Sequence, residues 1–278
     1  MEAAGAALTE AGARVAAPDW LAPGIACDLP FDGLTCARAE TAARDRFDGA
    51  AFDLAAQPAT GRRKSLLVAD MESTIIGQEL IDELAEIAGV HDRIAAITAR
   101  SMAGEMDFAS SIYERVALLA GLTTGALAEV AGRIALNPGA RTLIRTLRAG
   151  GVYTALVTGG FTCFAEAVAR DCGFDEMRGN ELLIDGDRLS GAVGEPVLGP
   201  KNKLTALTEL AGRHGLAMAA TAAIGDGAND LDMVRAAGMG VAYRGKPVLR
   251  QAAGFRLDHG DLTGLLYLQG YRQEDFTK

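Results

Sequence analysis

The stretch Leu66–Gly77, which reads LLVADMESTIIG, decides the fold of this chain. Its first four residues, Leu66–Ala69, are all apolar, and such an unbroken run predicts a strand buried on both faces, as in a parallel sheet covered by helices. The strand ends at Asp70, and open α/β sheets bind their ligands at the carboxyl ends of their strands. A second carboxylate, Glu72, and two hydroxyl side chains follow. The stretch therefore predicts an α/β sheet with a polar site at this edge.

Two later apolar runs end in side chains that suit the same site. Val152–Gly160 (VYTALVTGG) ends in Thr158 and two glycines, and Ala219–Ile224 leads into Gly225–Asp230 (GDGAND). Lys203 lies between these two runs. Each motif alone has a simpler explanation, since aspartate caps many helices and Asp-Gly is a common turn. Together the motifs predict a site that binds an anion and a metal ion.

In this order the motifs resemble those of the haloacid dehalogenase-like phosphatases, and within them those of the phosphoserine phosphatase family. The nucleophile motif of that family reads D-x-D-S-T, and this chain has D-M-E-S-T at Asp70–Thr74. The resemblance extends over about residues 64–278. It implies hydrolysis of O-phosphoserine to serine and phosphate through an aspartyl-phosphate, the last step of serine biosynthesis in that family. The implied cofactor is Mg²⁺, which prefers oxygen ligands.

The resemblance also implies the catalytic and metal-binding residues. Asp70 is the implied nucleophile, which would split the hydrolysis into two steps. Glu72 is the implied acid and base. The implied metal ligands are Asp70, Asp226 and the backbone carbonyl of Glu72, with Asp230 in the second shell or in contact through water.

A lysine is expected to neutralise Asp70 and the charge that develops on the phosphoryl group. We favour Lys203 over Lys201, because Lys203 precedes a helical pattern in the way the family's lysine does. Either lysine taken alone would be explained as a surface charge. The phosphoryl oxygens are expected to bind Thr158 and the backbone N–H groups of the two glycines after it, close to the start of a helix at Phe161.

The substrate contacts implied by the resemblance lie mainly in a helical region that follows the first strand. Glu79 is expected to pair with the substrate amino group and Arg115 with its carboxylate, for which a bidentate guanidinium is suited. A first-turn acid and a surface arginine are the ordinary explanations for these residues. The implied set is Glu79, Arg115, Met102 and Phe108 from this region, with Thr158, Gly159, Gly160 and Asn229 from the strand ends.

One residue departs from the family pattern. The family has aspartate where this chain has Glu72, which keeps the carboxyl group and adds a methylene. A displacement of ~1 Å can cost on the order of 10²-fold in rate. Three interpretations stay open: a phosphoserine phosphatase in which Glu72 serves as acid and base, a catalytically impaired phosphoserine-binding protein, and a phosphatase or phosphotransferase for another small phosphate ester.

The composition limits the remaining classes of function. The chain has 278 residues, of which 49% are hydrophobic and 23% are charged, as in ordinary globular proteins. The net charge of −9 argues against a nucleic-acid binder, so a phosphate site must be built locally. No run has the apolar length of a membrane span, and the N-terminus lacks the basic region of a signal peptide. We expect a small-molecule substrate, no nucleic acid and no membrane as partners, and a monomer or a homodimer.

The cysteines indicate a reducing compartment. Cys27, Cys36, Cys163 and Cys172 show no C-x-x-C spacing, and the chain has only 3 histidines. A structural zinc site is therefore disfavoured, and reduced thiols in a cytoplasmic protein are the simpler interpretation.

The predicted fold is a doubly wound, mostly parallel α/β sheet of the haloacid dehalogenase-like type, with an inserted helical-bundle cap and a small N-terminal α+β domain. We assign residues 1–60 to the N-terminal domain, 61–77 and 136–278 to the catalytic core, and 78–135 to the cap. The N-terminal domain is compared with a degenerate ACT domain, since an ACT fold begins with a strand and this chain begins with a helix. A packing appendage without a ligand is an equal alternative.

Periodicity and turn residues predict the individual elements. The N-terminal domain is predicted to hold helices at Ala3–Ala13 and Cys36–Arg46 and a strand at Ala51–Ala55. The predicted cap helices are Gln78–Ala88, His91–Met102, Asp107–Leu119 and Thr123–Ile134. The predicted core strands after the first are Val152–Thr158, Ala219–Ile224, Gly240–Tyr243 and Phe255–Leu257, with a hairpin of Glu181–Ile184 and Leu189–Ala192. The predicted core helices are Arg141–Ala149, Phe161–Cys172, Asn202–His214, Asp230–Ala237 and Asp261–Leu268.

Overall fold

The computed structural model describes residues 1–277, and within them six parallel strands form a central sheet. The strands are β5 (Leu66–Ala69), β6 (Tyr153–Phe161), β7 (Glu176–Asn180), β10 (Thr221–Gly225), β11 (Met239–Tyr243) and β12 (Phe255–Leu257). Their order is β12-β11-β10-β5-β6-β7, so the strand order reverses at β5. Such a reversal leaves a crevice at the carboxyl ends of the strands, and Asp70 follows β5 at that place.

The unbroken apolar run of β5 is explained by helices on both faces of the sheet. Leu67 belongs to a hydrophobic cluster with the residues of α7 (Ala140–Ala149) and α8 (Thr162–Cys172). Leu66 and Val68 point to the other face, into a cluster with α9 (Pro200–Arg213) and α10 (Leu231–Ala236). The doubly wound α/β fold predicted from the sequence is therefore confirmed. Two shorter helices complete the core: α11 (Pro247–Ala252) and α12 (Gly264–Leu268).

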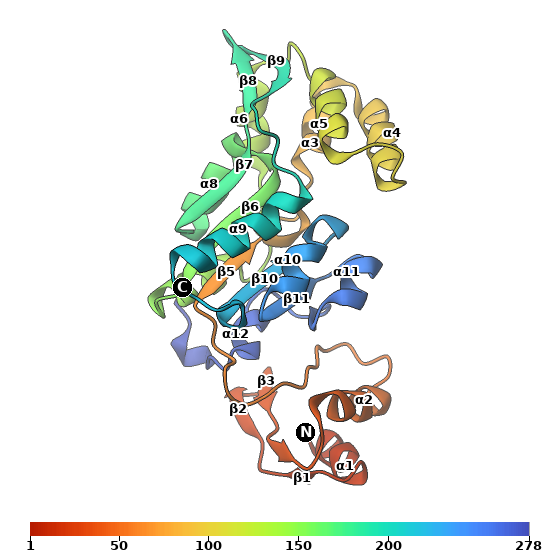
Figure 1. Cartoon of the computed structure of the whole chain (residues 1–278), viewed down its shortest axis with the longest axis vertical. Coiled ribbons are helices and arrows are strands. Elements are labelled where there is room, and N and C mark those ends of the chain that lie inside the picture. The colour runs from red at the N-terminus through yellow and green to blue at the C-terminus, as the bar shows by residue number, and fades with distance from the viewer. Residues whose placement is uncertain (278) are drawn as a thin grey trace.

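The cap lies beyond the carboxyl edge of the sheet, at the top of Figure 1. It consists of α3 (Leu80–Ala88), α4 (His91–Met102), α5 (Phe108–Ala117) and α6 (Thr124–Arg133). All of them begin and end within two residues of the predicted bounds. Asn137 connects the segment that leads into the cap with the segment that leads out of it. Its side-chain amide donates to the carbonyl oxygens of Thr74 and Ile76.

The predicted hairpin forms as β8 (Leu182–Asp185) and β9 (Arg188–Val193), but it packs on the cap rather than on the sheet. The backbone N–H of Gly121, after α5, donates to the carbonyl of Leu189 at 2.8 Å. Gly191 leaves room for this contact, since a Cβ atom there would lie 2.8 Å from the Cβ of Ala120. The hairpin thus accompanies the cap in space, although its sequence lies within the range 136–278 assigned to the core.

The N-terminal domain lies at the opposite end of the molecule from the cap (Figure 1). Its elements are α1 (Glu2–Glu10), β1 (Arg14–Val15), β2 (Asp19–Ala22), β3 (Ala26–Asp28), β4 (Phe31–Asp32) and α2 (Cys36–Arg46). β1 pairs with β4 and β2 with β3, both antiparallel. The strand predicted at Ala51–Ala55 is wrong: this segment is irregular, and its Asp53 carboxylate accepts the backbone N–H groups of Asp258, His259 and Gly260 instead of joining a sheet.

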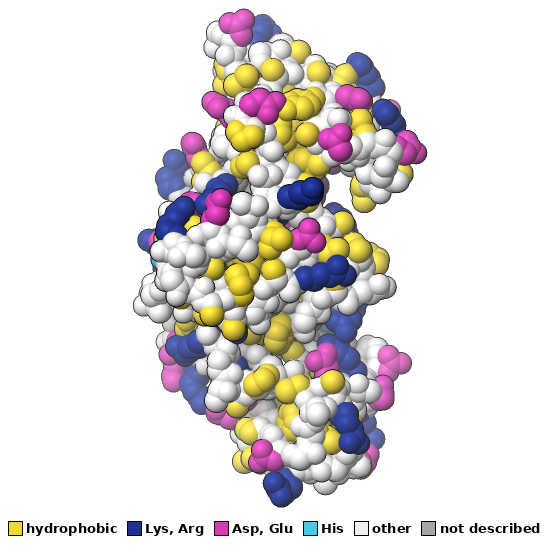
Figure 2. Space-filling model, in the orientation of Figure 1, with side chains coloured by type: hydrophobic (Ala, Val, Ile, Leu, Met, Phe, Trp, Pro, Cys, Tyr) yellow, Lys and Arg dark blue, Asp and Glu magenta, His cyan; other side chains and the backbone are white. Residues whose placement is uncertain are grey.

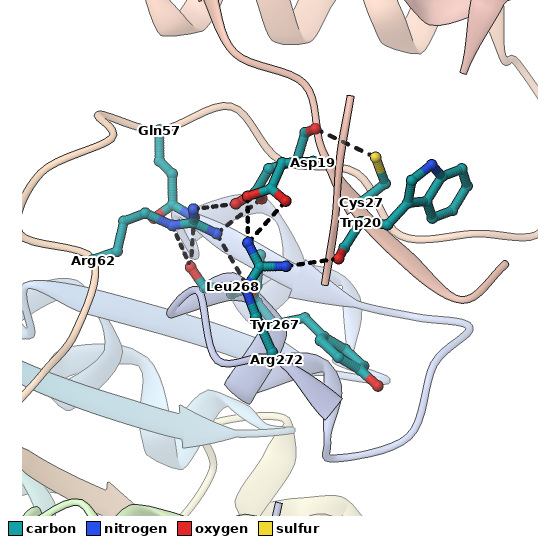
Figure 3. A network of polar contacts seen from close by, with 9 residues as sticks. Asp19, Trp20, Cys27, Gln57, Arg62, Tyr267, Leu268 and Arg272 are labelled. Atoms are coloured by element: carbon teal, nitrogen blue, oxygen red, sulfur yellow. Dashed lines mark hydrogen bonds and ion pairs between the residues drawn. The ribbon is translucent and has the colours of Figure 1, made fainter. Parts of the chain in front are cut away.

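Two arginines tie the N-terminal domain to the C-terminal segment of the core (Figure 3). The Arg62 guanidinium donates to both carboxylate oxygens of Asp28, at 2.5 and 3.0 Å, and to the carbonyls of Tyr267 and Leu268. Arg272 binds both oxygens of Asp19 at 2.8 Å. These contacts lie away from the carboxyl edge of the sheet, so this interface anchors the domain without reaching the site.

Besides the strands β1–β4 of the N-terminal domain, one strand and one α-helix of the core were missed from the sequence. β7 was not predicted because Arg178-Gly179-Asn180 lacks the apolar pattern of a strand, and α11 because it begins at Pro247 and covers less than two turns. Among residues 1–277 no helix combines the length and the hydropathy needed to cross a membrane.

Candidate active site

A cavity opens between the cap and the carboxyl edge of the sheet, in the region where the right side of Figure 2 shows an indented surface. It collects ten of the residues proposed from the sequence. These are Asp70, Glu72, Glu79, Phe108, Arg115, Thr158, Gly159, Gly160, Asp226 and Asn229. Lys203 and Asp230 lie directly beneath them, bonded to the floor of the cavity. Met102 is not brought to the site: its side chain, at the end of α4, is 75% exposed.

The floor of the cavity is a chain of buried charges. The Lys203 ammonium lies 2.6 Å from Oδ1 of Asp70 and 2.6 Å from Oδ1 of Asp230. Oδ2 of Asp230 accepts the backbone N–H groups of Asp226 and Gly227, each at 3.1 Å. Gly225 is required next to it, since a Cβ atom there would lie 2.3 Å from the carboxylate carbon of Asp230. The end of β10 and the start of α9 are therefore locked together around one lysine.

The electrostatics favour a charged Lys203. Burial opposes the ammonium form, but the carboxylates of Asp230 and Asp70 raise the pKa of Lys203 above its ordinary value. Lys201, the rival candidate, lies two residues earlier on α9 and is exposed to solvent. The geometry thus places only one of the two lysines against Asp70.

The loop after β5 turns sharply so that its polar groups face the cavity. Ser73 adopts a φ of 55°, which few residues other than glycine tolerate. The Asp70 carboxylate caps this turn by accepting the N–H of Met71 at 2.8 Å. Both hydrogen bonds described for Asp70 fall on Oδ1, from Met71 and from Lys203. This leaves Oδ2 as the oxygen available for chemistry.

Three carboxylates suit a divalent cation. Oxygen atoms of Asp70, Asp226 and Asp230 lie within 4.8 Å of one another, and all three residues are buried. Both oxygens of Asp230 are engaged by Lys203 and backbone N–H groups, so Asp70 and Asp226 are the better direct ligands. An all-oxygen donor set of this kind fits Mg²⁺.

Glu72 spans the cavity from the loop after β5 to the cap. Its Oε1 accepts the N–H of Leu80, the first residue of α3, at 2.8 Å. Its Oε2 occupies the space beside Gly160, where a Cβ atom would lie 2.7 Å away. Burial, and then the neighbouring Glu79 carboxylate, raise the pKa of Glu72 to about 7. A carboxyl group with a pKa near neutrality is suited to both giving and taking a proton.

The cap supplies the opposite wall. Glu79, just before α3, accepts a hydrogen bond from the hydroxyl of Ser73 at 2.8 Å. Arg115 donates through Nε to the carbonyl of Ser111 in its own helix, and its charge faces Glu72 and Glu79. The Phe108 ring packs against Gly159, where a Cβ atom would lie 3.0 Å from the ring.

Another side of the cavity is formed by the end of β6. The hydroxyl oxygen of Thr158 accepts the N–H of Gly160 at 2.8 Å. The strand continues through both glycines to Phe161, which is the N-cap of α8 rather than part of the helix. The sequence had predicted that the strand ends at Thr158 and the helix begins at Phe161, whereas the backbone stays in the strand through Phe161.

Lys246 is a cavity residue that sequence reasoning missed. Its ammonium lies 3.0 Å from Oδ2 of Asp226, and its backbone N–H donates to the Asp226 carbonyl at 2.7 Å. It therefore holds Asp226 at both ends. Lys246 follows β11 closely, and its position after the carboxyl end of a parallel strand was the signal that could have identified it.

Comparison with known proteins agrees with this geometry. A model of the haloacid dehalogenase-like hydrolase family matches residues 67–235. Phosphoserine phosphatase SerB2 of Mycobacterium tuberculosis is 44% identical over 209 residues, which are 75% of this chain and 51% of that protein. The phosphoserine phosphatase of Streptomyces coelicolor is 39% identical over 97% of this chain and 67% of its own length. That of Lactococcus lactis is 40% identical over 73% of this chain and 94% of its own length.

Solved structures show the same fold. A haloacid dehalogenase family hydrolase of Salmonella enterica serovar Typhi superposes with a TM-score of 0.83 at 29% identity, covering 92% of this chain and 89% of that one. A substrate-bound phosphoserine phosphatase superposes with a TM-score of 0.68 at 33% identity, covering 73% of this chain and 97% of that one.

The buried aspartate at the end of β5, the lysine on α9 and the acidic loop after β10 stand in one α/β core, and this chain belongs to the haloacid dehalogenase-like hydrolase family. The curated relatives described above are phosphoserine phosphatases. The chain spans about half the length of the M. tuberculosis relative and nearly all of the L. lactis one.

Proposed function

We propose that this protein is a Mg²⁺-dependent phosphatase that hydrolyses O-phosphoserine to serine and phosphate. The observation that supports the proposal is that the floor and the cap of one cavity present different charged side chains to the same space. The floor presents Asp70 with Lys203, while the cap presents Glu79 and Arg115, one charge of each sign. A phosphorylated amino acid is the ligand whose phosphate, amino and carboxylate groups match these charges. The relatives named phosphoserine phosphatase support the same assignment.

The first chemical step forms an acyl phosphate on Asp70. Its Oδ2 attacks the phosphorus atom, the bond from phosphorus to the serine oxygen breaks, and that oxygen takes a proton from the carboxyl group of Glu72. The products are serine and an aspartyl-phosphate. Burial raises the pKa of Asp70, and the Lys203 ammonium, 2.6 Å from Oδ1, counters this rise and so favours the ionised form that attacks.

The second step releases phosphate. Glu72, now a carboxylate, takes a proton from a water molecule as the water oxygen attacks phosphorus, and the bond to Asp70 breaks. The pKa of Glu72 near 7 makes both its forms accessible at neutral pH. We propose that the hydroxyl of Thr158 and the N–H of Gly159 bind the phosphoryl oxygens, while the N–H of Gly160 donates to the Thr158 hydroxyl, and that Asn229 contacts the substrate.

The residues that would hold Mg²⁺ are Asp70, Asp226 and the backbone carbonyl of Glu72, with Asp230 acting through water. When bound, the ion offsets the negative charge that the carboxylates and the phosphoryl group bring together. Lys246 contributes by fixing the carboxylate of Asp226.

We also propose a cytoplasmic location and a monomeric or homodimeric state. Cys27, Cys36, Cys163 and Cys172 are free thiols in the structure, which accords with a reducing compartment.

The test is phosphate release from a panel of esters in the presence of Mg²⁺. We expect kcat/KM for phosphoserine to exceed by about 10²-fold the values for phosphoethanolamine, which lacks the carboxylate, and 3-phosphoglycerate, which lacks the amino group. Equal rates on all three esters would assign the site to another small phosphate ester. The variant Glu72→Asp is measured in parallel. Turnover by this variant alone would show that the protein is an impaired phosphatase.

A further inference from the structure

A buried amide on the edge strand β7 connects two parts of the site that are remote in sequence. Asn180, the last residue of β7, is 2% exposed. Its Nδ2 donates to the carbonyl of Gly159 at 2.8 Å and to that of Leu198 at 3.0 Å, and its Oδ1 accepts the N–H of Leu198 at 2.7 Å. Both N–H groups and the oxygen of the amide are therefore engaged with backbone.

The two bonded segments carry different functional groups. Gly159 lies between Thr158 and Gly160 on the phosphoryl side of the cavity. Leu198 lies just before Gly199, the N-cap of α9, and that helix carries Lys203 in its first turn. Asn180 thus fixes the distance between the hydroxyl on β6 and the ammonium on α9.

The bond to the Gly159 carbonyl also sets the direction of the next N–H group. The carbonyl of Gly159 and the N–H of Gly160 belong to one trans peptide, so they point in opposite directions. Holding the carbonyl turns the N–H toward the hydroxyl oxygen of Thr158, which accepts it at 2.8 Å. With that lone pair occupied, the Thr158 hydroxyl retains its own proton for donation into the cavity.

The backbone of β7 packs closely against the Thr158–Gly160 segment. β7 passes so near the phosphoryl loop that a Cβ atom on Gly179 would lie 3.2 Å from the carbonyl oxygen of Gly160 and 3.3 Å from a methyl carbon of Thr158. A shift of this strand end would therefore be transmitted directly to the residues that face the phosphoryl group.

We propose that Asn180 is a positioning residue for phosphoryl transfer, which orients the Thr158–Gly160 segment and sets its distance from Lys203. The inference rests on the proposed phosphatase function, and it extends the site to a residue that touches neither substrate nor metal.

The test compares Asn180→Asp with Gln269→Glu. Aspartate keeps the shape of the side chain but replaces its N–H donors by an oxygen that faces two carbonyls. Gln269 is a matched control, since its amide is 2% exposed and bonds the backbone of Lys64 and Leu265 far from the cavity. Orthovanadate is the probe of the phosphoryl side, and L-serine is the probe of the cap side. Their dissociation constants are measured by calorimetry with Mg²⁺, next to phosphoserine turnover and thermal unfolding.

We expect Asn180→Asp to weaken vanadate binding at least tenfold and to lower kcat/KM by a similar factor, with serine affinity within twofold of the unsubstituted protein. Gln269→Glu is expected to keep both affinities. Vanadate affinity unchanged in Asn180→Asp, or vanadate and serine affinities reduced equally, would overturn the inference. If Asn180→Asp does not fold, Asn180→Ser, which loses the bridge without the repulsion, is judged by the same two affinities.

The two proposals fail in distinguishable ways. In one case the unsubstituted protein binds vanadate but does not cleave phosphoserine, and Asn180→Asp no longer binds vanadate. This result would refute the phosphoserine assignment and support the role of Asn180. If phosphoserine is cleaved equally well by both proteins, the role of Asn180 falls and the function stands.

Discussion

The floor of the cavity and its cap wall are built in different ways. On the floor, Lys203, Asp70 and Asp230 are at most 3% exposed and are joined by hydrogen bonds between different core elements. On the cap wall, the hydrogen bond that the structure describes for Arg115 stays within α5, and Glu79 accepts one from a loop serine. The groups proposed for phosphoryl chemistry are thus fixed to the sheet, whereas the groups proposed to select the substrate belong to the cap. Variants of the floor should therefore abolish catalysis, and variants of the cap should alter selectivity.

The largest effect is expected from Asp70→Asn on the floor. The amide cannot form the aspartyl-phosphate, so we expect phosphate release to fall on the order of 10⁵-fold. Phosphate release is measured with Mg²⁺, and circular dichroism checks that the variant is folded. A folded variant that retains a tenth of the activity would show that another residue is the nucleophile.

Next in size is Lys203→Met, which removes the cation shared by two buried carboxylates. Breaking a buried ion pair costs about 3–5 kcal/mol of unfolding free energy. Urea denaturation without added metal measures this loss of unfolding free energy. Lys201→Met, on the exposed side of the same helix, is the control and should change stability by less than about 0.5 kcal/mol. An equal loss of unfolding free energy in both variants would contradict the role of Lys203 in holding the two carboxylates.

Glu72 lies between the two walls and gives a pH-dependent prediction. Its folded-state pKa of about 7 lies above its ordinary value of 4.5. A carboxyl raised in this way contributes stability that is fully present below pH 4.5 and is lost as the pH rises through about 7. We expect the unfolding free energy of the metal-free protein to fall over this window by on the order of 3 kcal/mol more than that of Glu72→Gln.

This fall is measured by urea denaturation in EDTA between pH 4 and pH 8. Glu166→Gln on the outer side of α8 is the control, and it should keep the pH profile of the unsubstituted protein. If Glu72→Gln and the unsubstituted protein had the same pH profile of unfolding free energy, a group other than Glu72 would be responsible for the fall.

The smallest effect is expected on the cap, from Arg115→Lys. Lysine keeps the charge but loses the fork that binds a carboxylate at two points. A hydrogen bond to a charged group is worth about 1.5–3 kcal/mol, so KM for phosphoserine should rise about 10–100-fold. Phosphoethanolamine, which has no carboxylate, should be cleaved as by the unsubstituted protein. Arg93→Lys on α4 is the control, and an equal loss on both esters would assign Arg115 a structural role.

Many of the helices, the strands and the proposed site residues could be predicted from the sequence because the patterns that indicate them are local. The proposed catalytic groups follow apolar runs at Asp70, Thr158 and Asp226, and parallel strands bring their carboxyl ends to one edge. The cap helices were predicted within two residues because amphipathic periodicity and the turn glycines mark each of them. These features depend on neighbours within a few residues, so no distant contact is needed to infer them.

The remaining features depend on contacts between distant segments. Whether Met102 faces the cavity or the solvent depends on how α4 is oriented on the other cap helices, and it is exposed. Asn180 and Lys246 gain their importance from carbonyls and carboxylates that folding brings beside them. Asp53 lies in a segment that looked like a strand, but three N–H groups some 205 residues later capture its carboxylate. Local pattern determined the elements and the strand ends that carry the chemistry. Packing decided which polar side chains meet there, because a hydrogen bond needs a partner whose place only the folded chain defines.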